Sequence, residues 1–510
     1  MSALAGIAAA VVAAGAGDLT AAVLAPGASP FAVIGGALID AAPPWAKDTA
    51  IALFGTADKL ALLIGIGLVL LAVAALAGIV QRRRPPWGAA ILGALGAIGV
   101  IVAMTRPDAE QVWWVPSAVS GVIGTAALAL LARRAGPAAR TAPARAAVAT
   151  DGLATPAPDR RAFLVWTGTA TALGVLAAIG AQAVRAGGSA VRTVRAAIRL
   201  PRAAVAAAPV PVGAELDLPG LAPVVTPNTD FYRIDTALVV PDVAPADWRL
   251  RVHGMVENEV ELTWEELLAL PLEESYTTLT CVSNDVGGDL IGNALWLGYP
   301  TRHLLARARP TADADMVLSR SVDGFTASTP LEALTDERGA LLAVGMNGEP
   351  LPVEHGFPVR MVVPGLYGYV SATKWVTELY VTRFDRDRAY WTDRGWSARG
   401  PVKLQSRIDV PRAGIDAGET VIAGVAWHQH SGITGVEVQV DAGPWQPATL
   451  ATAISADTWV QWRMPWTATP GRHTIRCRAT GADGSTQPEQ RTPVAPDGAT
   501  GWHERTVQVT

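Results

Sequence analysis

Long apolar runs fill the first part of the chain, whereas the rest alternates polar and apolar residues over short stretches. A helix needs roughly 20 apolar residues to cross a bilayer. Stretches of that length lie near residues 2–26, 58–80, 87–105, 113–133 and 162–182. The pattern predicts an N-terminal all-α transmembrane bundle of about five helices, in which Gly17 and Asp18 interrupt the first span.

Basic residues beside these spans predict their orientation. They are Arg82, Arg83 and Arg84 after the second span, Arg133, Arg134, Arg140 and Arg145 after the fourth, and Arg160 and Arg161 before the fifth. Positive charge favours the cytoplasmic side. We therefore expect a multi-pass protein of the cell membrane, surrounded by lipid, with a cytoplasmic N-terminus and an extracytoplasmic C-terminal half.

The fifth span has a second interpretation. Its sequence, "DRRAFLVWTGTATALGVLAAIG", resembles a twin-arginine export signal placed inside the chain. That route carries folded proteins, which is necessary when a cofactor is inserted into a protein before its export. An ordinary membrane helix with basic flanks explains the same residues, so both interpretations stay open.

Changes in composition predict the domain boundaries. A bundle of four spans occupies residues 1–133, an Ala/Pro/Arg-rich cytoplasmic linker 134–160, the fifth span 161–183, and a second linker, the tether, 184–215. Residues 216–400 mix short strands with a few helices, which indicates an α+β domain. Residues 401–510 show short strands separated by turn signals, typical of an immunoglobulin-like β-sandwich.

Local patterns in the α+β part are specific. "WRLRVHGMV" and "VELTW" alternate like paired strands, and "TWEELLAL" predicts a helix capped by Thr263. "TLTCV" reads as a half-buried strand that ends at Cys281 and enters a loop of Ser, Asn, Asp and Gly. The chain thus places a rare thiol beside a loop whose backbone can approach a ligand closely.

Composition narrows the possible functions. A chain of 510 residues with 50% hydrophobic residues is too long for a single core, and its net charge of −4 gives no indication of a nucleic-acid partner. The chain has two cysteines, and none of its seven histidines lies in the spans, so we expect neither an iron–sulfur cluster nor haem. His428 and His430 are predicted to lie in a solvated loop and not at a metal.

The segment "TLTCVSNDVGGDLIGNALWLG" (278–298) resembles the metal-ligand segment of the sulfite oxidase family, in which a lone cysteine precedes "GNA-x-W-x-G". Further stretches resemble the family in its own order. They are "PNTDFYRID" (227–235), "SVDGFTASTPLEAL" (321–334), "GMNGEPLPVEHGFPVRMVVPGLYGYVSATKWV" (345–376), "TWVQWRMPW" and "GWHERTVQV". The resemblance covers about 220–510 and leaves out the membrane half.

The resemblance implies a molybdenum–molybdopterin cofactor, with Cys281 as the protein's metal ligand. The implied cofactor-binding residues are Phe231, Tyr232, Arg233, Cys281, Asp323, His355, Arg360, Ser371 and Lys374. Among them, His355 and Arg360 would bind the pterin, and Ser371 and Lys374 would hold its phosphate end. The implied catalytic residues are Cys281, Arg233, Arg463 and Trp296, with Arg463 reaching from the C-terminal domain into the substrate site.

Asp285 departs from the family pattern, because sulfite oxidases carry arginine soon after the ligand cysteine. A carboxylate there should repel sulfite. Oxidation of sulfite and reduction of a sulfoxide or another oxo-compound therefore both stay open, with a small oxo-donor or oxo-acceptor as substrate. Electrons would pass to a separate redox protein, to oxygen or to quinone, and the C-terminal domain implies a possible homodimer.

Two rival interpretations remain. The chain could be a non-enzymatic membrane protein that displays a β-sandwich interaction module, with Cys281 bridged to Cys477. It could also be a cofactor-binding fold that has lost turnover.

Overall fold

The computed structural model describes residues 1–42, 49, 58–106, 109, 111–134, 160–187, 190–237 and 239–510. The predicted cytoplasmic linker lies almost wholly outside these residues. The described chain divides into two compact units: unit 1 comprises Met1–Ala190 and Ala237–Asp242, and unit 2 comprises Val191–Thr236 and Val243–Thr510.

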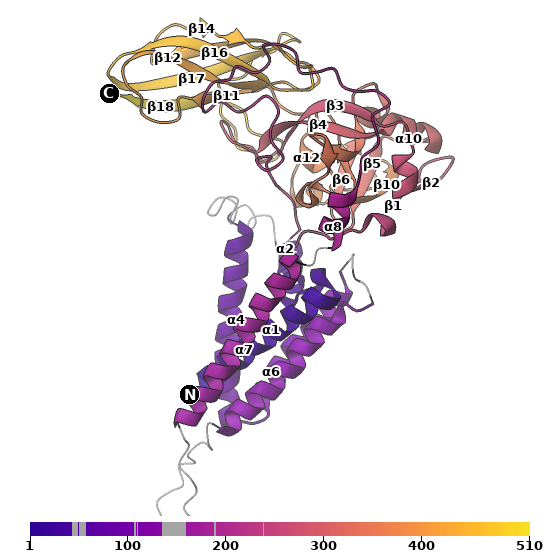
Figure 1. Ribbon diagram of the computed structural model, residues 1–510, viewed down its shortest axis with the longest axis vertical. Coiled ribbons are helices and arrows are strands. Elements are labelled where there is room, and N and C mark those ends of the chain that lie inside the picture. The colour runs from indigo at the N-terminus through magenta and orange to yellow at the C-terminus, as the bar shows by residue number, and fades with distance from the viewer. Residues whose placement is uncertain are drawn as a thin grey trace, which may run out of the picture. The chain divides into compact units, whose positions relative to one another are not determined.

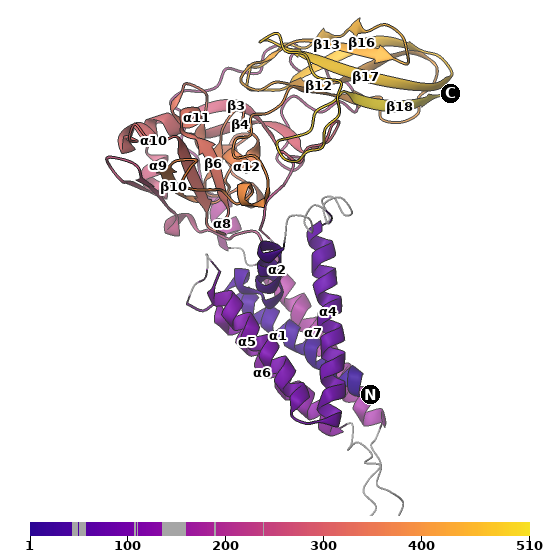
Figure 2. The ribbon, with the colours of Figure 1, turned by 180° about the vertical axis from the view of Figure 1, so that it is seen from behind.

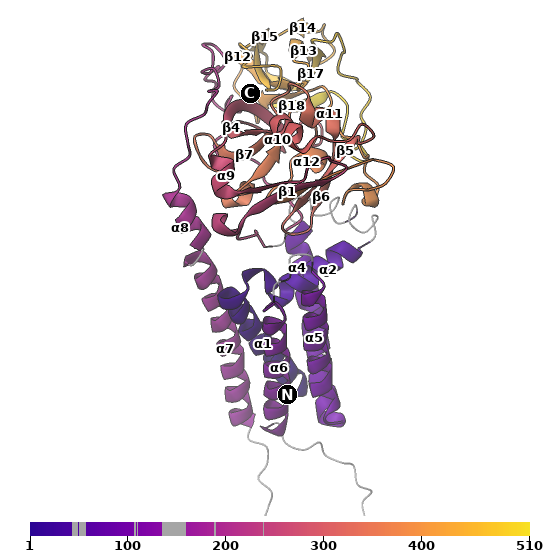
Figure 3. The ribbon, with the colours of Figure 1, turned by 90° about the vertical axis from the view of Figure 1, so that its right-hand side faces the viewer.

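Unit 1 is helical. Its helices are α1 (Ser2–Leu24), α2 (Pro30–Ala41), α4 (Asp58–Arg83), α5 (Trp87–Met104), α6 (Trp114–Arg134) and α7 (Arg160–Gly187). Five of them, all but α2, are long and apolar enough to cross a membrane, which confirms the predicted number of spans. Figure 3 shows these helices running along the bundle, and α1 contacts α4, α6 and α7.

Helix α1 continues through Gly17 and Asp18, where the sequence suggested an interruption. Asp18 forms an ion pair of 2.7 Å with Arg185 of α7, and the hydroxyl of Ser29 donates to the same carboxylate at 2.8 Å. Gly17 permits close packing, because a Cβ there would lie 2.9 Å from the Cβ of Ser120 in α6. A charged residue is tolerated in this apolar helix because its partner comes from another helix.

The predicted tether is not a free extended segment over its described length. It begins inside α7, includes α8 (Ala190–Ala197), and then lies along unit 2. The amide of Ala204 donates to the carbonyl of Leu272, and the amide of Leu216 donates to the side chain of Gln461. These bonds fix the second half of the segment in place.

The α+β domain of unit 2 is built on two sheets. One has the order β2-β1-β10-β5-β6, and the other has β3-β4-β7-β8 with β9 paired to β7. The strands are β1 (Arg249–Gly254), β2 (Val260–Thr263), β3 (Glu273–Thr280), β4 (Ile291–Pro300), β5 (Met316–Ser321), β6 (Thr326–Pro330), β7 (Leu341–Met346), β8 (Glu349–Pro350), β9 (Arg360–Val362) and β10 (Val376–Thr382). The helices are α9 (Trp264–Leu268), α10 (Thr301–Ala308), α11 (Leu331–Thr335) and α12 (Gly368–Ser371). In Figure 1, α10 lies beside β3 and β4.

The local predictions for this domain are confirmed. Strands β1 and β2 pair antiparallel, as their alternation indicated. Thr263 caps α9: its side chain accepts from the amide of Glu266, whose carboxylate accepts from the amide of Thr263. This reciprocal capping box satisfies two amides that the start of a helix leaves without partners.

Residues 401–510 form the predicted β-sandwich. Its sheets have the orders β11-β12-β16-β15 and β14-β13-β17-β18. The strands are β11 (Gln405–Val410), β12 (Gly418–Trp427), β13 (Ile433–Val440), β14 (Gln446–Pro447), β15 (Thr449–Leu450), β16 (Val460–Ala468), β17 (Gly471–Gly481) and β18 (His503–Val509). Figure 2 shows these strands together at the C-terminal end, and Ile422, Trp462, Val438 and Ile475 from both sheets share one core.

Candidate active site

Cys281 lies directly after β3, as the sequence predicted, but that strand is not half-buried. Its last four residues, Thr277 to Thr280, are all buried. The sandwich covers the second face: the amide of Thr278 donates to the carbonyl of Asp457, and its hydroxyl accepts from the amide of Trp459 at 2.9 Å. Threonines satisfy the polar contacts on that face, which is why the sequence looked solvated there.

The loop after Cys281 is closed by its own backbone. The amide of Cys281 donates to the carbonyl of Leu290 at 3.0 Å, and the amide of Leu290 donates to Oδ1 of Asn284 at 2.9 Å. The thiol itself accepts only a 3.4 Å contact from the amide of Ser283 among the described residues, and burial raises its pKa. A buried thiol with so little hydrogen bonding is suited to binding a soft metal, which would favour the thiolate.

An aromatic wall stands beside this thiol. Phe231 stacks on Tyr232 with ring centroids 5.3 Å apart and meets the rings of Trp296 and His355 edge-on at 5.8 and 5.6 Å. Gly292 of the "GNA" element leaves room for this wall, since a Cβ there would lie 2.8 Å from the Phe231 ring.

The pKa of Tyr232 is strongly raised, first by burial and then by Cys281. Its hydroxyl is therefore neutral and within electrostatic range of the thiol. Tyr232 could thus serve as a hydrogen-bond donor beside the metal ligand.

Arg360 is a buried cation with no carboxylate partner among the described residues. Its guanidinium, in a residue only 5% exposed, donates to the carbonyls of His355 and Ala372 at 3.1 and 3.5 Å, and it lies over the Trp296 ring at 5.1 Å. Burial lowers its pKa to about 10. A buried charge of this kind needs an opposite charge, so the pocket fits an anionic group such as a pterin phosphate.

Other buried polar atoms also fit a bound group. Nδ2 of Asn284, in the Cys281 loop, and Oγ of Ser321, before the Asp323 turn, have no hydrogen-bond partner within the described chain. His355 is held neutral, because burial and then Arg360 and Lys374 lower its pKa to about 4. A neutral imidazole can offer one donor and one acceptor to a pterin edge.

Lys374 and Arg233 meet at one carboxylate. Asp235 accepts from Nζ of Lys374 at 2.7 Å and from Nε of Arg233 at 2.9 Å. Burial lowers the pKa of Lys374 to about 8. Arg233 is thus tied to the lysine end of the site.

The turn that carries Asp323 lies next to this lysine. The amide of Val322 donates to the carbonyl of Trp375 at 3.0 Å, and Oδ1 of Asp323 accepts from the amide of Phe325. The structure therefore brings the turn of Asp323 close to Lys374 and Arg233, while Tyr232 and Trp296 both contact Phe231.

Two predicted residues lie differently from the expectation. Ser371 is fully buried and its hydroxyl donates to the carbonyls of Leu366 and Tyr367, so its proton is not available to a phosphate. Arg463 has an exposed side chain in the middle of β16, in register with Ala423 and Thr449. Strand alternation turns Arg463 outward because its neighbour Trp462 faces the sandwich core.

One sandwich residue that reaches the cysteine loop is Arg407 of β11, which sequence reasoning missed. Its Nη1 donates to the carbonyl of Gly288 at 2.8 Å, while Nε is paired with Asp409 at 2.7 Å. The ring of His503 packs against Gly287 of the same loop. The only available signal was the Arg-x-Asp spacing, which puts both side chains on one face of a strand.

Tyr367 was also missed. It belongs to the "PGLYGY" stretch, and Cys281 contributes, after burial, to the rise of its pKa to about 12. Pro364 and Gly365, just before it, are held from two sides. Arg338 donates to the carbonyl of Pro364 at 3.2 Å, and a Cβ on Gly365 would lie 3.1 Å from His430 of the sandwich.

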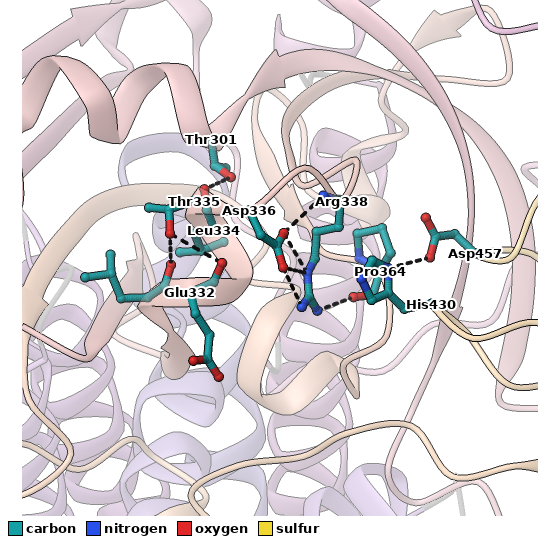
Figure 4. A network of polar contacts seen from close by, with 10 residues as sticks. Thr301, Glu332, Leu334, Thr335, Asp336, Arg338, Pro364, His430 and Asp457 are labelled. Carbon is teal, nitrogen blue, oxygen red and sulfur yellow. Dashed lines mark hydrogen bonds and ion pairs between the residues drawn. The ribbon is translucent and has the colours of Figure 1, made fainter. Parts of the chain in front are cut away.

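Figure 4 shows this junction, in which Arg338 is fixed by Asp336 and His430 by Asp457. Asp457 also holds Thr278 of β3, three residues before Cys281. The junction therefore links Tyr367 and the cysteine strand to the sandwich.

The bridged-cysteine interpretation is not supported. Cys281 and Cys477 are both free and buried, and Cys477 lies in the sandwich core, where it accepts from the hydroxyl of Ser406. Across the described residues no three His, Cys, Asp or Glu side chains gather as a metal site, and His430 is bonded to Asp457.

Comparison with known proteins identifies the family of the domain that carries these residues. The family described as the oxidoreductase molybdopterin binding domain matches residues 237–391. Mitochondrial sulfite oxidase of Macaca fascicularis is 29% identical over 321 residues, which are 53% of this chain and 58% of that protein. The uncharacterized oxidoreductase YuiH of Bacillus subtilis (strain 168) is 34% identical over 153 residues, which are 30% of this chain and 74% of that protein.

The sulfane dehydrogenase SoxCD from Paracoccus pantotrophus shares the fold, with a TM-score of 0.50, 24% identity, and coverage of 57% of this chain and 82% of that chain. The chain spans little more than half the length of the sulfite oxidase that it matches. The matched segment holds Cys281, Arg360 and Lys374 in the arrangement described above. This chain therefore belongs to the sulfite oxidase family of molybdopterin-binding oxidoreductases.

Proposed function

We propose that this protein is a membrane-anchored, extracytoplasmic molybdenum-cofactor enzyme that transfers one oxo group with two electrons. The reaction class is XO + 2e⁻ + 2H⁺ ⇌ X + H₂O. The observation that carries the proposal is that one site holds a buried, free Cys281 thiol and the buried Arg360 cation, which has no carboxylate partner among the described residues. The first suits a soft metal and the second an anionic cofactor.

Each residue of the site has its own proposed role in binding the cofactor. Cys281 would hold the metal through Sγ, and Phe231 and Tyr232 would flank the cofactor. Arg360 would bind its negative charge, and neutral His355 its polar edge. The cofactor, when bound, supplies the exchange of an oxo group coupled to a two-electron change at the metal.

The protein supplies a buried and rigid environment for the cofactor. Trp296 is fully buried and its indole donates to the carbonyl of Thr277 at 3.1 Å, so its ring cannot turn away from Arg360. The neutral hydroxyls of Tyr232 and Tyr367 can donate a hydrogen bond to an oxygen atom near the metal, or hold a proton there. Arg407 keeps the cysteine loop against the sandwich.

Sulfite is the first substrate to test, because the sulfite oxidases matched here carry that activity in their names. The electrostatics of the site are more favourable to sulfite than the sequence suggested: Asp285, expected to repel sulfite, has a side chain that is 64% exposed and lies 3.7 Å from Arg491. Solvent screens such a carboxylate. Reduction of a sulfoxide or another oxo-compound is the second candidate.

The basic flanks of the spans support an extracytoplasmic active site, with a twin-arginine-like segment at Arg160 and Arg161. The acceptor or donor of electrons would be a separate redox protein or a membrane quinone. The sandwich supports a homodimer through its likeness to the family's C-terminal domain.

Elemental analysis of protein purified from a host that makes the cofactor tests the proposal. We expect stoichiometric molybdenum in the wild type and X-ray absorption with three sulfur neighbours, falling to two in Cys281→Ser. Cys477→Ser is the matched control and should leave both readings unchanged. Folded protein without molybdenum, or an unchanged sulfur count in Cys281→Ser, would contradict the assignment.

A further inference from the structure

A cavity of about 280 Å³ lies inside unit 1, among α1, α2, α4, α5 and α6. Its wall is almost entirely apolar, and its only polar side chains among the described residues are Ser117 and Ser120 of α6. Ser117 is 1% exposed, and its hydroxyl has no hydrogen-bond partner among the described residues. A buried hydroxyl without a partner is costly, which indicates that something in this cavity accepts from it.

A second, more open cleft of about 710 Å³ adjoins the cavity. Val11, Ala14 and Phe31 line both. Because Ala14 ends in a methyl group, little side-chain volume separates cavity and cleft there. Polar groups line the cleft, in contrast to the cavity: they are Asp18, Ser29, Gln182 and Arg185.

The serines of the cavity and the polar residues of the cleft lie toward the same end of the bundle. Arg185 is in the last turn of α7, and Ser117 is in the first turn of α6. Asp18 follows Gly17, which packs against Ser120 of α6. The cavity continues from there along Ile66, Leu70 and Ala74 of α4. Cavity and cleft together suit an amphiphile with a polar head near the helix ends and an apolar chain within the bundle.

The charge of the cleft selects the kind of head group. Both terminal nitrogens of Arg185 bind Asp18, at 3.0 and 2.7 Å, so the pair is neutral as a whole. Nε of Arg185 is buried and has no partner in the described chain. An anionic phosphate would meet the Asp18 carboxylate, whereas a neutral carbonyl could accept from Nε–H without repulsion.

We propose that unit 1 binds a membrane quinone. One ring carbonyl accepts from Nε–H of Arg185, the other accepts from the hydroxyl of Ser117, and the isoprenoid chain occupies the apolar cavity beside α4. The alternative occupant with similar chemistry is a phospholipid, whose acyl chain would fill the cavity. Binding stands independently of the proposed oxo transfer; only a role of the quinone as electron acceptor would rest on it.

The test begins with full-length protein purified in mild detergent from quinone-containing membranes, followed by extraction and quantification of quinone and phospholipid. We expect stoichiometric quinone in the wild type. Ala14→Phe, which fills the shared wall, should reduce retained quinone at least about tenfold. Ala94→Phe, the same substitution at an exposed position of α5, is the control and should retain it.

Two further variants test the donors by titration with a soluble quinone analogue. Ser117→Ala removes one hydroxyl and should weaken binding about fivefold. Arg185→Lys keeps a cation for Asp18 but removes Nε–H, so it should weaken binding by a similar factor while the melting temperature stays near that of the wild type. A purely structural arginine would leave analogue affinity unchanged in this variant.

Three results would overturn the proposal: phospholipid in place of quinone, full quinone retention in Ala14→Phe, or equal loss in Ala94→Phe. Molybdenum content is measured on the same samples. Quinone binding without molybdenum would support this inference and reject the oxo-transfer proposal, and the converse would do the opposite.

Discussion

Nη1 of Arg407 donates a 2.8 Å hydrogen bond to the carbonyl of Gly288, and so joins the sandwich to the loop that follows Cys281. The same arginine is paired with Asp409, and both side chains are buried. A residue of the C-terminal domain thereby fixes the backbone around the predicted metal ligand. The sandwich is in this sense part of the candidate active site.

Replacing Arg407 by leucine should therefore impair both stability and activity. It leaves Asp409 buried without its partner, which costs roughly 3–5 kcal/mol in the free energy of unfolding. Oxo-transfer turnover should fall more than the loss of folded protein explains, because the loop loses its anchor. Arg463→Leu, at an exposed position, should change stability by less than about 0.5 kcal/mol and spare turnover. Loss of activity in Arg463→Leu alone would restore the role that the sequence suggested for it.

Replacing Arg360 by methionine should have opposite effects on cofactor-free and cofactor-loaded protein. Without cofactor, the guanidinium is a buried charge with no carboxylate partner in the described chain, so its removal should raise the melting temperature. Cofactor retention should fall at least about tenfold, because the anion loses its counter-charge. Lys374→Met is the control: Lys374 is already paired with Asp235, so its loss should lower the melting temperature. A destabilised cofactor-free Arg360→Met would show that the arginine is needed for the fold itself.

Asp285→Arg tests the substrate electrostatics. The sequence suggested that this carboxylate repels sulfite and that charge reversal should lower KM. Because the side chain is 64% exposed, the structure predicts a small effect, less than about twofold at physiological ionic strength. Steady-state kinetics with sulfite at low and high salt measure it. A large, salt-dependent drop in KM would show that the charge of Asp285 does repel sulfite.

Acidification should destabilise unit 2 through His503. Burial, followed by Arg505 and Arg407, lowers its pKa to about 4, while the unfolded chain titrates near about 6.5. The unfolded state therefore binds a proton first as pH falls, and stability present above about pH 6.5 is lost between there and pH 4, by at most about 3 kcal/mol. The melting temperature at pH 7 and pH 5 measures this loss.

His503→Asn isolates the contribution of this histidine, since its Oδ1 can still accept from the amide of Ile408 as Nδ1 does now. The pH dependence should become shallower in this variant. His355, whose pKa is also lowered, will keep part of it. His473→Asn should not reproduce the effect, because Asp441 raises the pKa of His473 and its contribution is lost as pH rises. An unchanged slope in His503→Asn would mean that other groups dominate.

Export offers a test of orientation. Changing Arg160 and Arg161 together to lysine preserves the positive charge but should block twin-arginine transport. The catalytic half would then stay inside and resist protease added to intact cells. Normal cleavage of the variant would indicate ordinary membrane insertion.

Several features followed from the sequence alone. Apolar runs of membrane-spanning length predicted five helices, Thr263 predicted the start of α9, and period-two alternation located β1 and β2. The order of motifs around Cys281 and His355 indicated the family. These signals are local or colinear with the chain, so no knowledge of distant contacts is needed to read them.

Only the tertiary structure decided which residues meet. Alternation shows that a strand has two faces but not what covers each, so β3 looked half-solvated although Trp459 and Asp457 cover it. The same limit explains why the sequence pointed to Arg463, and not to Arg407, as the sandwich residue that reaches the site. The ion pair between Asp18 and Arg185 joins residues 167 positions apart, and no local pattern predicts it. Burial and charge pairing are set by elements that pack together from distant parts of the chain, which the sequence near any one residue does not encode.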